Sequence, residues 1–145
     1  MAEKELRFED VELGDDIGPV ERTITDEQVQ AFVEIWGAES GPSRFTSEEV
    51  AKGEGLPGMI VPGAMNVGVL SQLLTGWSST VTLKMLDLMF RQMVRHNVPM
   101  QLKGIVTDKN VVDGEPQVEC DIWMEGPDGT RLVMGKAIVV LPTRG

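Results

Sequence analysis

The chain has one histidine and one cysteine, and these side chains are the first candidates for reactivity. His96 could serve as a general acid or base near neutral pH. It stands between Arg95 and Asn97 in a short loop after a predicted strand, where side chains are usually exposed to solvent. We therefore predict an exposed loop residue and not a catalytic one. Cys120 has no second cysteine with which to form an intramolecular disulfide, and no cluster of metal ligands surrounds it.

Three cationic side chains, Lys84, Arg91 and Arg95, occur in or near one predicted strand. The guanidinium group of arginine binds phosphate through paired N–H donors, so the two arginines are candidates for contact with a phosphorylated ligand. The alternative is that these charges lie on a strand edge, where they deter pairing with other strands. The sequence leaves both interpretations open.

The first helix has a clear start. Thr25 and Gln28 have the spacing of a capping box, which predicts a helix over residues 26–36 with Gly37 as its stop. Its apolar residues recur at i, i+3, i+4 and i+7 and so form one stripe that faces the core. The stripe consists of Val29, Phe32, Val33 and Trp36.

A second capping box, Thr46 with Glu49, predicts a short helix that Gly53 and Gly55 end. The run over residues 63–75 then has helical length and apolar residues on nearly every face, which is typical of a helix surrounded by protein. Its Gly68 costs about 1 kcal/mol of helix stability relative to alanine, and packing or a ligand must compensate.

From residue 82 onward the apolar residues recur with a period of two, which indicates half-buried antiparallel strands. Residues 5–24 are predicted to form an edge or cover segment. A curved antiparallel sheet wrapped around the helix 63–75 satisfies this order of elements. The predicted class is therefore α+β, in a single domain over residues 1–145.

The formal net charge of −10 lies entirely in the first 60 residues, which carry 15 acidic and 5 basic side chains against 8 and 8 in the remainder. This acidity argues against sequence-independent binding of nucleic acid, which needs clustered lysine and arginine. No apolar stretch reaches the roughly 20 uninterrupted residues of a membrane span, and the charged amino terminus lacks the apolar core of a signal peptide. With the single cysteine, these features predict a cytoplasmic protein.

Four segments resemble, in the same order, segments of the MaoC-like hydratases and dehydratases of the hotdog superfamily. The first resembles the opening strand and turn of that family, the second its overhanging helix and active-site loop, the third its central helix and the fourth the strand after it. The segments are RFEDVELGDDI (7–17), TDEQVQAFVEIWGAESGP (25–42), LPGMIVPGAMNVGVLSQLL (56–74) and MLDLMFRQMV (85–94).

The resemblance implies a single hotdog fold that binds the thioester of an acyl-CoA or enoyl-CoA. Members of the family hydrate a trans-2-enoyl-CoA with an aspartate and a histidine in the loop after the first helix. In this sequence the aspartate position falls on Ala38 and the histidine position on Ser43 or, with a shift of one residue, Arg44. Both members of the catalytic pair are thus replaced, while Ala38 and Arg44 keep their implied place in the substrate site.

Pro62 and Gly63 do match the family. By the resemblance, the N–H of Gly63 binds the thioester carbonyl, and the positive end of the helix dipole favours the negative charge that develops there. The alternative is that Gly63 serves only tight packing beneath Pro62. The resemblance also makes Arg91 and Arg95 candidates for contact with the phosphates of CoA.

The leading functional expectation is a hydratase-family protein that binds the thioester, as the substrate-binding subunit of a heteromeric hydratase whose partner supplies the catalytic pair. A homodimer with altered chemistry is the other form of this hypothesis. The alternatives are a thioesterase that uses Glu39 as base or nucleophile, and a non-catalytic acyl-CoA binding subunit. We expect pairing with a second hotdog subunit, and no cofactor or metal apart from the CoA of the substrate.

Overall fold

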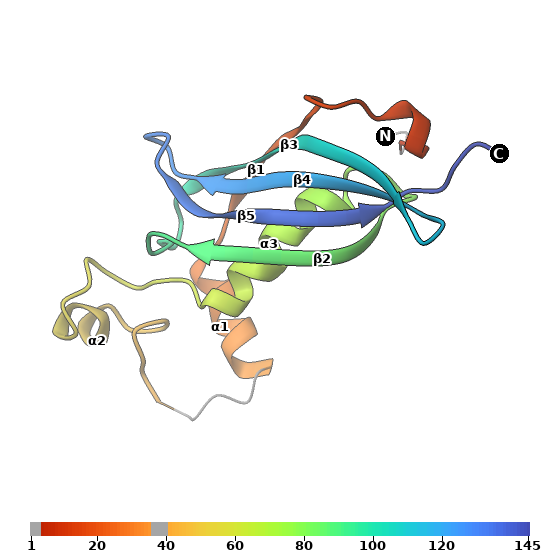
Figure 1. Ribbon diagram of the computed structural model, residues 1–145. Coiled ribbons are helices and arrows are strands. Elements are labelled where there is room, and N and C mark those ends of the chain that lie inside the picture. The colour runs from red at the N-terminus through yellow and green to blue at the C-terminus, as the bar shows by residue number, and fades with distance from the viewer. Residues whose placement is uncertain (1–3, 36–40) are drawn as a thin grey trace.

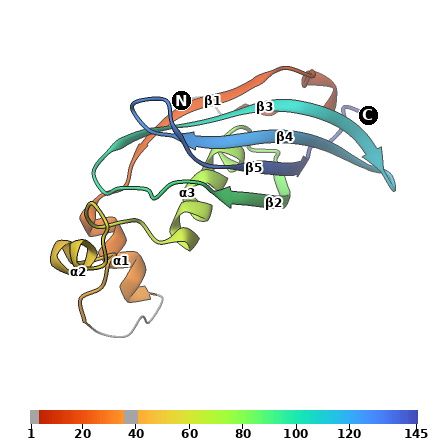
Figure 2. The ribbon, with the colours of Figure 1, turned by 60° about the vertical axis from the view of Figure 1, so that its left-hand side comes forward.

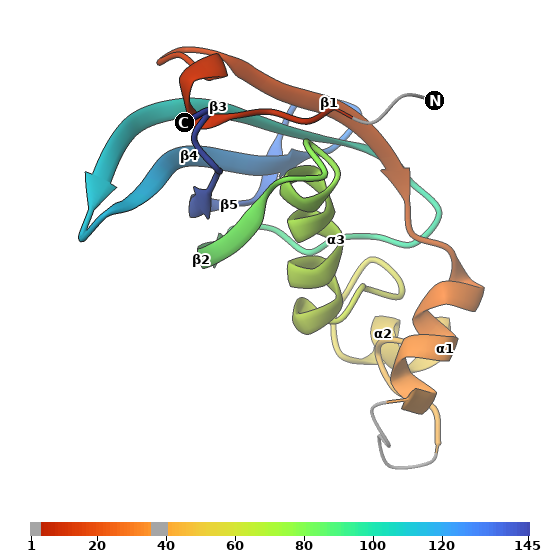
Figure 3. The ribbon, with the colours of Figure 1, turned by 90° about the vertical axis from the view of Figure 1, so that its right-hand side faces the viewer.

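A five-stranded antiparallel sheet curves around one long helix, with the strands in the spatial order β1-β3-β4-β5-β2 (Figures 1 and 3). The structure is a computed structural model, and it describes residues 4–35 and 41–145. The predicted site residues Ala38 and Glu39 lie outside these ranges. The strands are β1 (Asp16–Thr23), β2 (Thr82–Phe90), β3 (Pro99–Val112), β4 (Glu115–Glu125) and β5 (Arg131–Val140).

The long helix, α3, lies against the concave face of the sheet, as the apolar pattern predicts (Figure 3). The shorter helices α1 and α2 lie away from the sheet, beyond the amino-terminal end of α3 (Figure 2). None of the described helices is long and apolar enough to cross a membrane. The helices are η1 (Phe8–Asp10, a 3-10 turn), α1 (Asp26–Ile35), α2 (Glu48–Gly53) and α3 (Gly63–Thr75).

Local capping explains where the two short helices begin. Thr25 Oγ1 accepts from Gln28 N at 3.2 Å and Gln28 Oε1 accepts from Thr25 N at 3.0 Å, so the first capping box is confirmed. The second is wrong by one residue, because Ser47 Oγ caps α2 by accepting from Val50 N at 3.2 Å. The hydroxyl of Thr46 is already used in the preceding turn, where it accepts from Ser43 N.

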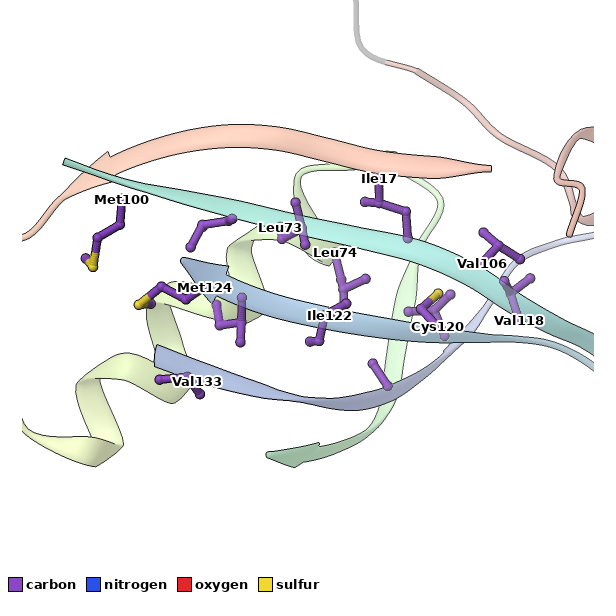
Figure 4. Packing of buried hydrophobic residues seen from close by; sticks show 14 of the residues in the cluster. Ile17, Leu73, Leu74, Met100, Val106, Val118, Cys120, Ile122, Met124 and Val133 are labelled. Atoms are coloured by element: carbon purple, nitrogen blue, oxygen red, sulfur yellow. The ribbon is translucent and has the colours of Figure 1, made fainter. Parts of the chain in front are cut away.

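The core lies between α3 and the inward face of the sheet (Figure 4). From Val118 to Met124 every second residue of β4 is buried, as the period of two predicts, and these residues share one buried cluster with Leu70, Leu73 and Leu74 of α3. Burying one such side chain completely contributes about 1.5–3 kcal/mol. The buried residues of β4 are Val118, Cys120, Ile122 and Met124.

The thiol of Cys120 is fully buried, and burial raises its pKa from an ordinary value of 9.0 to about 12, with a smaller contribution from the neighbouring carboxylates of Asp121 and Glu119. We expect a thiol-reactive aromatic disulfide to label Cys120 at pH 8 only after denaturation. Since the folded chain keeps the thiol proton and the unfolded chain loses it above pH 9.0, this group removes stability as the pH rises from 9.0 toward 12. Rapid labelling of the native protein would contradict this burial.

Residues 4–35 and 41–145 leave one side of α3 uncovered, which corrects the prediction of a helix surrounded by protein. Ala64, Gly68 and Gln72 are exposed along this side. A Cβ atom added at Gly68 would have no heavy atom within 4 Å, so packing inside the described chain does not compensate for this glycine. The helix is held by its opposite side, which carries the buried leucines.

Strand β2 forms one edge of the sheet and approaches β5 unusually closely. Leu88 is paired with Gly135, and a Cβ atom added at Gly135 would lie 2.0 Å from the carbonyl oxygen of Asp87. That separation is far below a van der Waals contact, so only glycine fits here without a backbone shift. The position of β2 therefore depends on Gly135.

Candidate functional site

The amino terminus of α3 presents N–H groups that nothing in the described chain binds. Pro62 is the N-cap residue and provides no side-chain cap, and its carbonyl oxygen accepts from the N–H groups of Met65 and Asn66 at 3.0 and 3.1 Å. The N–H groups of Gly63 and Ala64 have no acceptor among residues 4–35 and 41–145. Together with the helix dipole, these groups form a site for a partial or full negative charge.

Backbone pairing with the segment after β2 fixes this end of the helix in place. Val61 N donates to Val94 O at 2.8 Å, and Ile60 forms an isolated antiparallel bridge with Arg95. Ile60 N also donates to Arg44 O at 3.2 Å. The residues before Gly63 are thus held on two sides, so its N–H group has a defined direction.

A cleft of about 440 Å³, here called the α3 cleft, opens beside this helix terminus. Apolar side chains make up most of its lining, and the polar side chains in it are those of Asn66, Arg91 and Gln92. A small number of polar groups in an apolar cleft is typical of ligand sites. The lining residues are Ile60, Val61, Gly63, Asn66, Phe90, Arg91, Gln92, Met93 and Val94.

Packing does not explain why residue 63 is glycine. A Cβ atom added there would lie 3.6 Å from the ring of Phe90, which is an ordinary van der Waals contact. Alanine would therefore fit the folded chain at Gly63, but its methyl group would occupy space beside the free N–H groups. The described residues therefore give no support to the alternative that Gly63 serves only tight packing.

Asn66 is a site residue that the sequence analysis missed. Its side chain is 3% exposed, and its Oδ1 atom is buried without a hydrogen-bond partner in the described part of the chain. An unpaired buried polar atom costs about 1–3 kcal/mol. The signal in the sequence is an asparagine inside an otherwise apolar helix, where asparagine is a poor helix former.

The prediction that His96 is an exposed loop residue is wrong. The residue is 9% exposed, its Nδ1 lies 2.9 Å from Asp26 Oδ1, and its Nε2 lies 3.0 Å from the carbonyl oxygen of Ile60. Asn97 Nδ2 also donates to the carboxylate of Asp26. Because each ring nitrogen lies within hydrogen-bonding distance of an acceptor, His96 joins the start of α1 to the segment that leads into α3. This arrangement gives the histidine a structural role.

A second cleft of about 400 Å³, here called the α1 cleft, lies between α1 and the residues before α3. Glu27, Gln30 and Glu34 line it from the helix, opposite Phe45 and Met59. The buried ring of His96 contributes to its wall but carries no free nitrogen. The acidic lining of this cleft does not suit a phosphorylated ligand.

The structure brings some of the predicted binding residues together and separates others. Pro62, Gly63 and Arg91 meet at the α3 cleft, whereas Arg95 lines an adjoining cleft that shares Gln92 and Met93 with it. Arg91 and Arg95 form no ion pair with a described carboxylate. In contrast, Arg44 Nε lies 3.3 Å from Glu54 Oε1, and its guanidinium group lies above the ring of Phe45.

Apolar side chains on and after the edge strand β2 are exposed in the single chain. The exposed fractions of Met89, Phe90 and Met93 are 58%, 51% and 52%. An edge strand with this composition is a surface for pairing with a further strand.

Within the described residues, no group of three or more histidine, cysteine, aspartate or glutamate side chains is placed to hold a metal ion.

Known structures share this whole arrangement of sheet and helix. The chain is similar to a MaoC-like dehydratase from Rhodospirillum rubrum at 18% sequence identity, with a TM-score of 0.80 over 97% of this chain and 99% of that chain. It is similar to the (R)-hydratase PhaJ1 from Pseudomonas aeruginosa at 15% identity, with a TM-score of 0.83 over 97% of this chain and 88% of that chain. The chain has a hotdog fold. The predicted fold class is thereby confirmed, with α3 as the central helix of the hotdog.

A chain of the ChsH1–ChsH2 complex from Mycobacterium tuberculosis is also similar, at 13% identity and a TM-score of 0.74 over 89% of this chain and 97% of that chain. No protein-family model and no curated protein matches the sequence. At these identities the likeness establishes the hotdog fold, and function has to be argued from the site.

Proposed function

We propose that this hotdog chain binds the thioester of an acyl-CoA or enoyl-CoA in the α3 cleft, with the thioester carbonyl at the amino terminus of α3. The free N–H groups of Gly63 and Ala64 are the observation that carries this proposal. A thioester carbonyl that accepts from them gains most when negative charge develops on its oxygen, as it does during addition to a conjugated enoyl group. The apolar lining of the cleft suits the acyl chain.

We further propose that the chain is the substrate-binding subunit of a heteromeric hydratase. Adding water to an enoyl thioester requires a base to activate the water and an acid to protonate the α carbon. The described lining of the α3 cleft contains no carboxylate and no imidazole, and both ring nitrogens of His96 are engaged elsewhere. A second subunit that supplies these groups completes the site.

The exposed edge strand β2 is the surface proposed for this second subunit. It lies next to the α3 cleft, since Phe90 belongs to both. Pairing along β2 satisfies its free backbone groups and covers the exposed methionines. Two of the similar structures, ChsH1–ChsH2 and the HadBC (3R-hydroxyacyl-ACP dehydratase) complex, are assemblies of two different chains, which supports a heteromer for this chain also. Arg91 and Arg95 are exposed and line adjoining clefts, and they are proposed to contact the CoA phosphates.

Two alanine substitutions on the same helix test the binding site. Calorimetric titration with crotonyl-CoA should show binding to the wild-type chain, a loss of about tenfold or more in affinity for Gly63→Ala, and no change for Gly68→Ala. The methyl group of Gly63→Ala would lie beside the free N–H groups. The methyl group of Gly68→Ala would lie in open space on the exposed side of α3. Both variants should fold at least as stably as the wild type, because alanine is the better helix former.

Four outcomes would contradict parts of the proposal. Equal affinities of Gly63→Ala and the wild type would remove the carbonyl site, and no heat at millimolar crotonyl-CoA would remove thioester binding. Rapid loss of enoyl absorbance with the purified chain alone would show that no second subunit is needed. Release of free CoA that is abolished by Glu39→Gln would favour the thioesterase instead.

A further inference from the structure

The ring of His96 faces two oxygen atoms that accept hydrogen bonds, one on each side. Its Nδ1 lies 2.9 Å from Asp26 Oδ1, and its Nε2 lies 3.0 Å from the carbonyl oxygen of Ile60. A neutral imidazole carries one N–H and can donate to only one of these oxygens, whereas an imidazolium carries two and can donate to both. The second proton of the ring therefore decides whether both contacts are hydrogen bonds.

The contact with Ile60 acts on the backbone that leads directly into the carbonyl site. The N–H of Ile60 donates to Arg44 O at 3.2 Å, so the ring of His96 and this carbonyl oxygen hold Ile60 from two sides. Between Ile60 and Gly63 stands Pro62, whose φ is fixed by its own ring. A shift of the Ile60 carbonyl group is therefore passed on to the N–H group of Gly63.

The histidine ring is enclosed, but the carboxylate that it faces reaches solvent. The side chain of His96 is 5% exposed and that of Asp26 is 51% exposed, and both residues line the α1 cleft. The ring can thus exchange a proton with water on its Nδ1 side. The other charged side chains on the elements around the ring are Glu27 and Glu34 of α1, Glu48 of α2, Arg44 in the loop before α2, and the adjacent Arg95.

We propose that His96 is a positioning residue that directs the free N–H groups of Gly63 and Ala64, and that it does so fully only as an imidazolium. In that form the ring joins Asp26, at the start of α1, to the carbonyl group of Ile60 by two hydrogen bonds. When the ring loses its second proton, one of the two is lost and the segment before α3 is held less firmly. The inference rests on the proposed function, because it assumes that a thioester carbonyl lies at these N–H groups.

Calorimetric titration of the wild-type chain with crotonyl-CoA and with CoA, at two pH values, tests the proposal. The affinity for crotonyl-CoA divided by that for CoA isolates the contribution of the acyl thioester, because the phosphates titrate in both ligands. This ratio should fall by about threefold or more between about pH 5.5 and about pH 8, the range in which histidine side chains change charge. The direction follows from the loss of one hydrogen bond as the ring becomes neutral.

Two neighbouring substitutions on α1 test the source of this pH dependence. Asp26→Asn should abolish it, because an asparagine amide can donate to Nδ1 while the neutral ring donates to Ile60 through Nε2. Glu27→Gln is the matched control, since it removes a carboxylate from the same cleft that is not one of the two groups facing the ring nitrogens. The fall in the ratio should persist in Glu27→Gln. His96→Gln has no group at this position that titrates in the range, so its ratio should not change with pH.

The outcomes separate this inference from the proposed function. If the ratio for the wild type is the same at both pH values, the role of the His96 proton is wrong while thioester binding stands. A fall for Asp26→Asn as large as that for the wild type also overturns the proposal. If His96→Gln weakens CoA and crotonyl-CoA equally and lowers the melting temperature, His96 is a structural residue only. If crotonyl-CoA binds the wild type no more tightly than CoA at either pH, the proposed function fails and this inference fails with it.

Discussion

Replacing His96 with alanine is expected to lower the free energy of unfolding by about 2–4 kcal/mol. The substitution removes the contacts of the ring with the Asp26 carboxylate and with the carbonyl oxygen of the buried residue Ile60. It also opens a cavity where the ring lay. Chemical denaturation followed by tryptophan fluorescence measures the change.

A neighbouring substitution provides the control for His96. Asn97 Nδ2 donates to the same carboxylate of Asp26, but it does so at the exposed surface. Glycine tolerates the positive φ of 62° at this position, so Asn97→Gly should cost less than about 1 kcal/mol. An equal loss in the two variants would show that His96 does not connect α1 to the segment before α3.

Replacing Gly135 with alanine is expected to destabilise the chain by at least about 3 kcal/mol and to displace β2. The added methyl group would meet the carbonyl oxygen of Asp87 at 2.0 Å and the Cα of Leu88 at 2.8 Å. Both obstacles are backbone atoms, so a side-chain rotation cannot relieve the contact. The strand must move, and its pairing with β5 weakens.

The displacement of β2 has a second measurable effect. Because β2 is the proposed surface for the second subunit, light scattering after size-exclusion chromatography should show a smaller assembly for Gly135→Ala than for the wild type. Gly68→Ala is the matched control, since its methyl group meets no atom within 4 Å. A free energy of unfolding for Gly135→Ala within about 1 kcal/mol of the wild type would contradict the close approach of the two strands.

Much of the fold could be predicted because its signals are local. The capping box at Thr25 fixed the start of α1, and the change of apolar period after residue 82 identified the strands of the sheet. The error at α2 is also local: Thr46 and Ser47 are both good N-cap residues, and the hydrogen bond from Ser43 N to Thr46 Oγ1 decides between them. The sequence alone does not show which of these two residues caps α2.

The site was less predictable because its key contacts join distant residues. His96 contacts Asp26, which is 70 residues away in the sequence, and the carbonyl oxygen of Ile60, which is 36 residues away. No local sequence pattern predicts either contact. The prediction missed Asn66 for a different reason. The residues around it are apolar, and the pattern of apolar residues alone assigned the segment to a buried helix. The exposed side of α3 was missed because apolar residues on nearly every face of a helix do not show which side the rest of the chain leaves uncovered.

A crystal structure of the chain with crotonyl-CoA tests the central claim most directly. We predict that the thioester carbonyl oxygen lies about 3 Å from the backbone N of Gly63 or Ala64, with the acyl chain in the α3 cleft beside Asn66 and Phe90. Electron density for the thioester in the α1 cleft, or CoA bound with its acyl group outside the α3 cleft, would contradict the account.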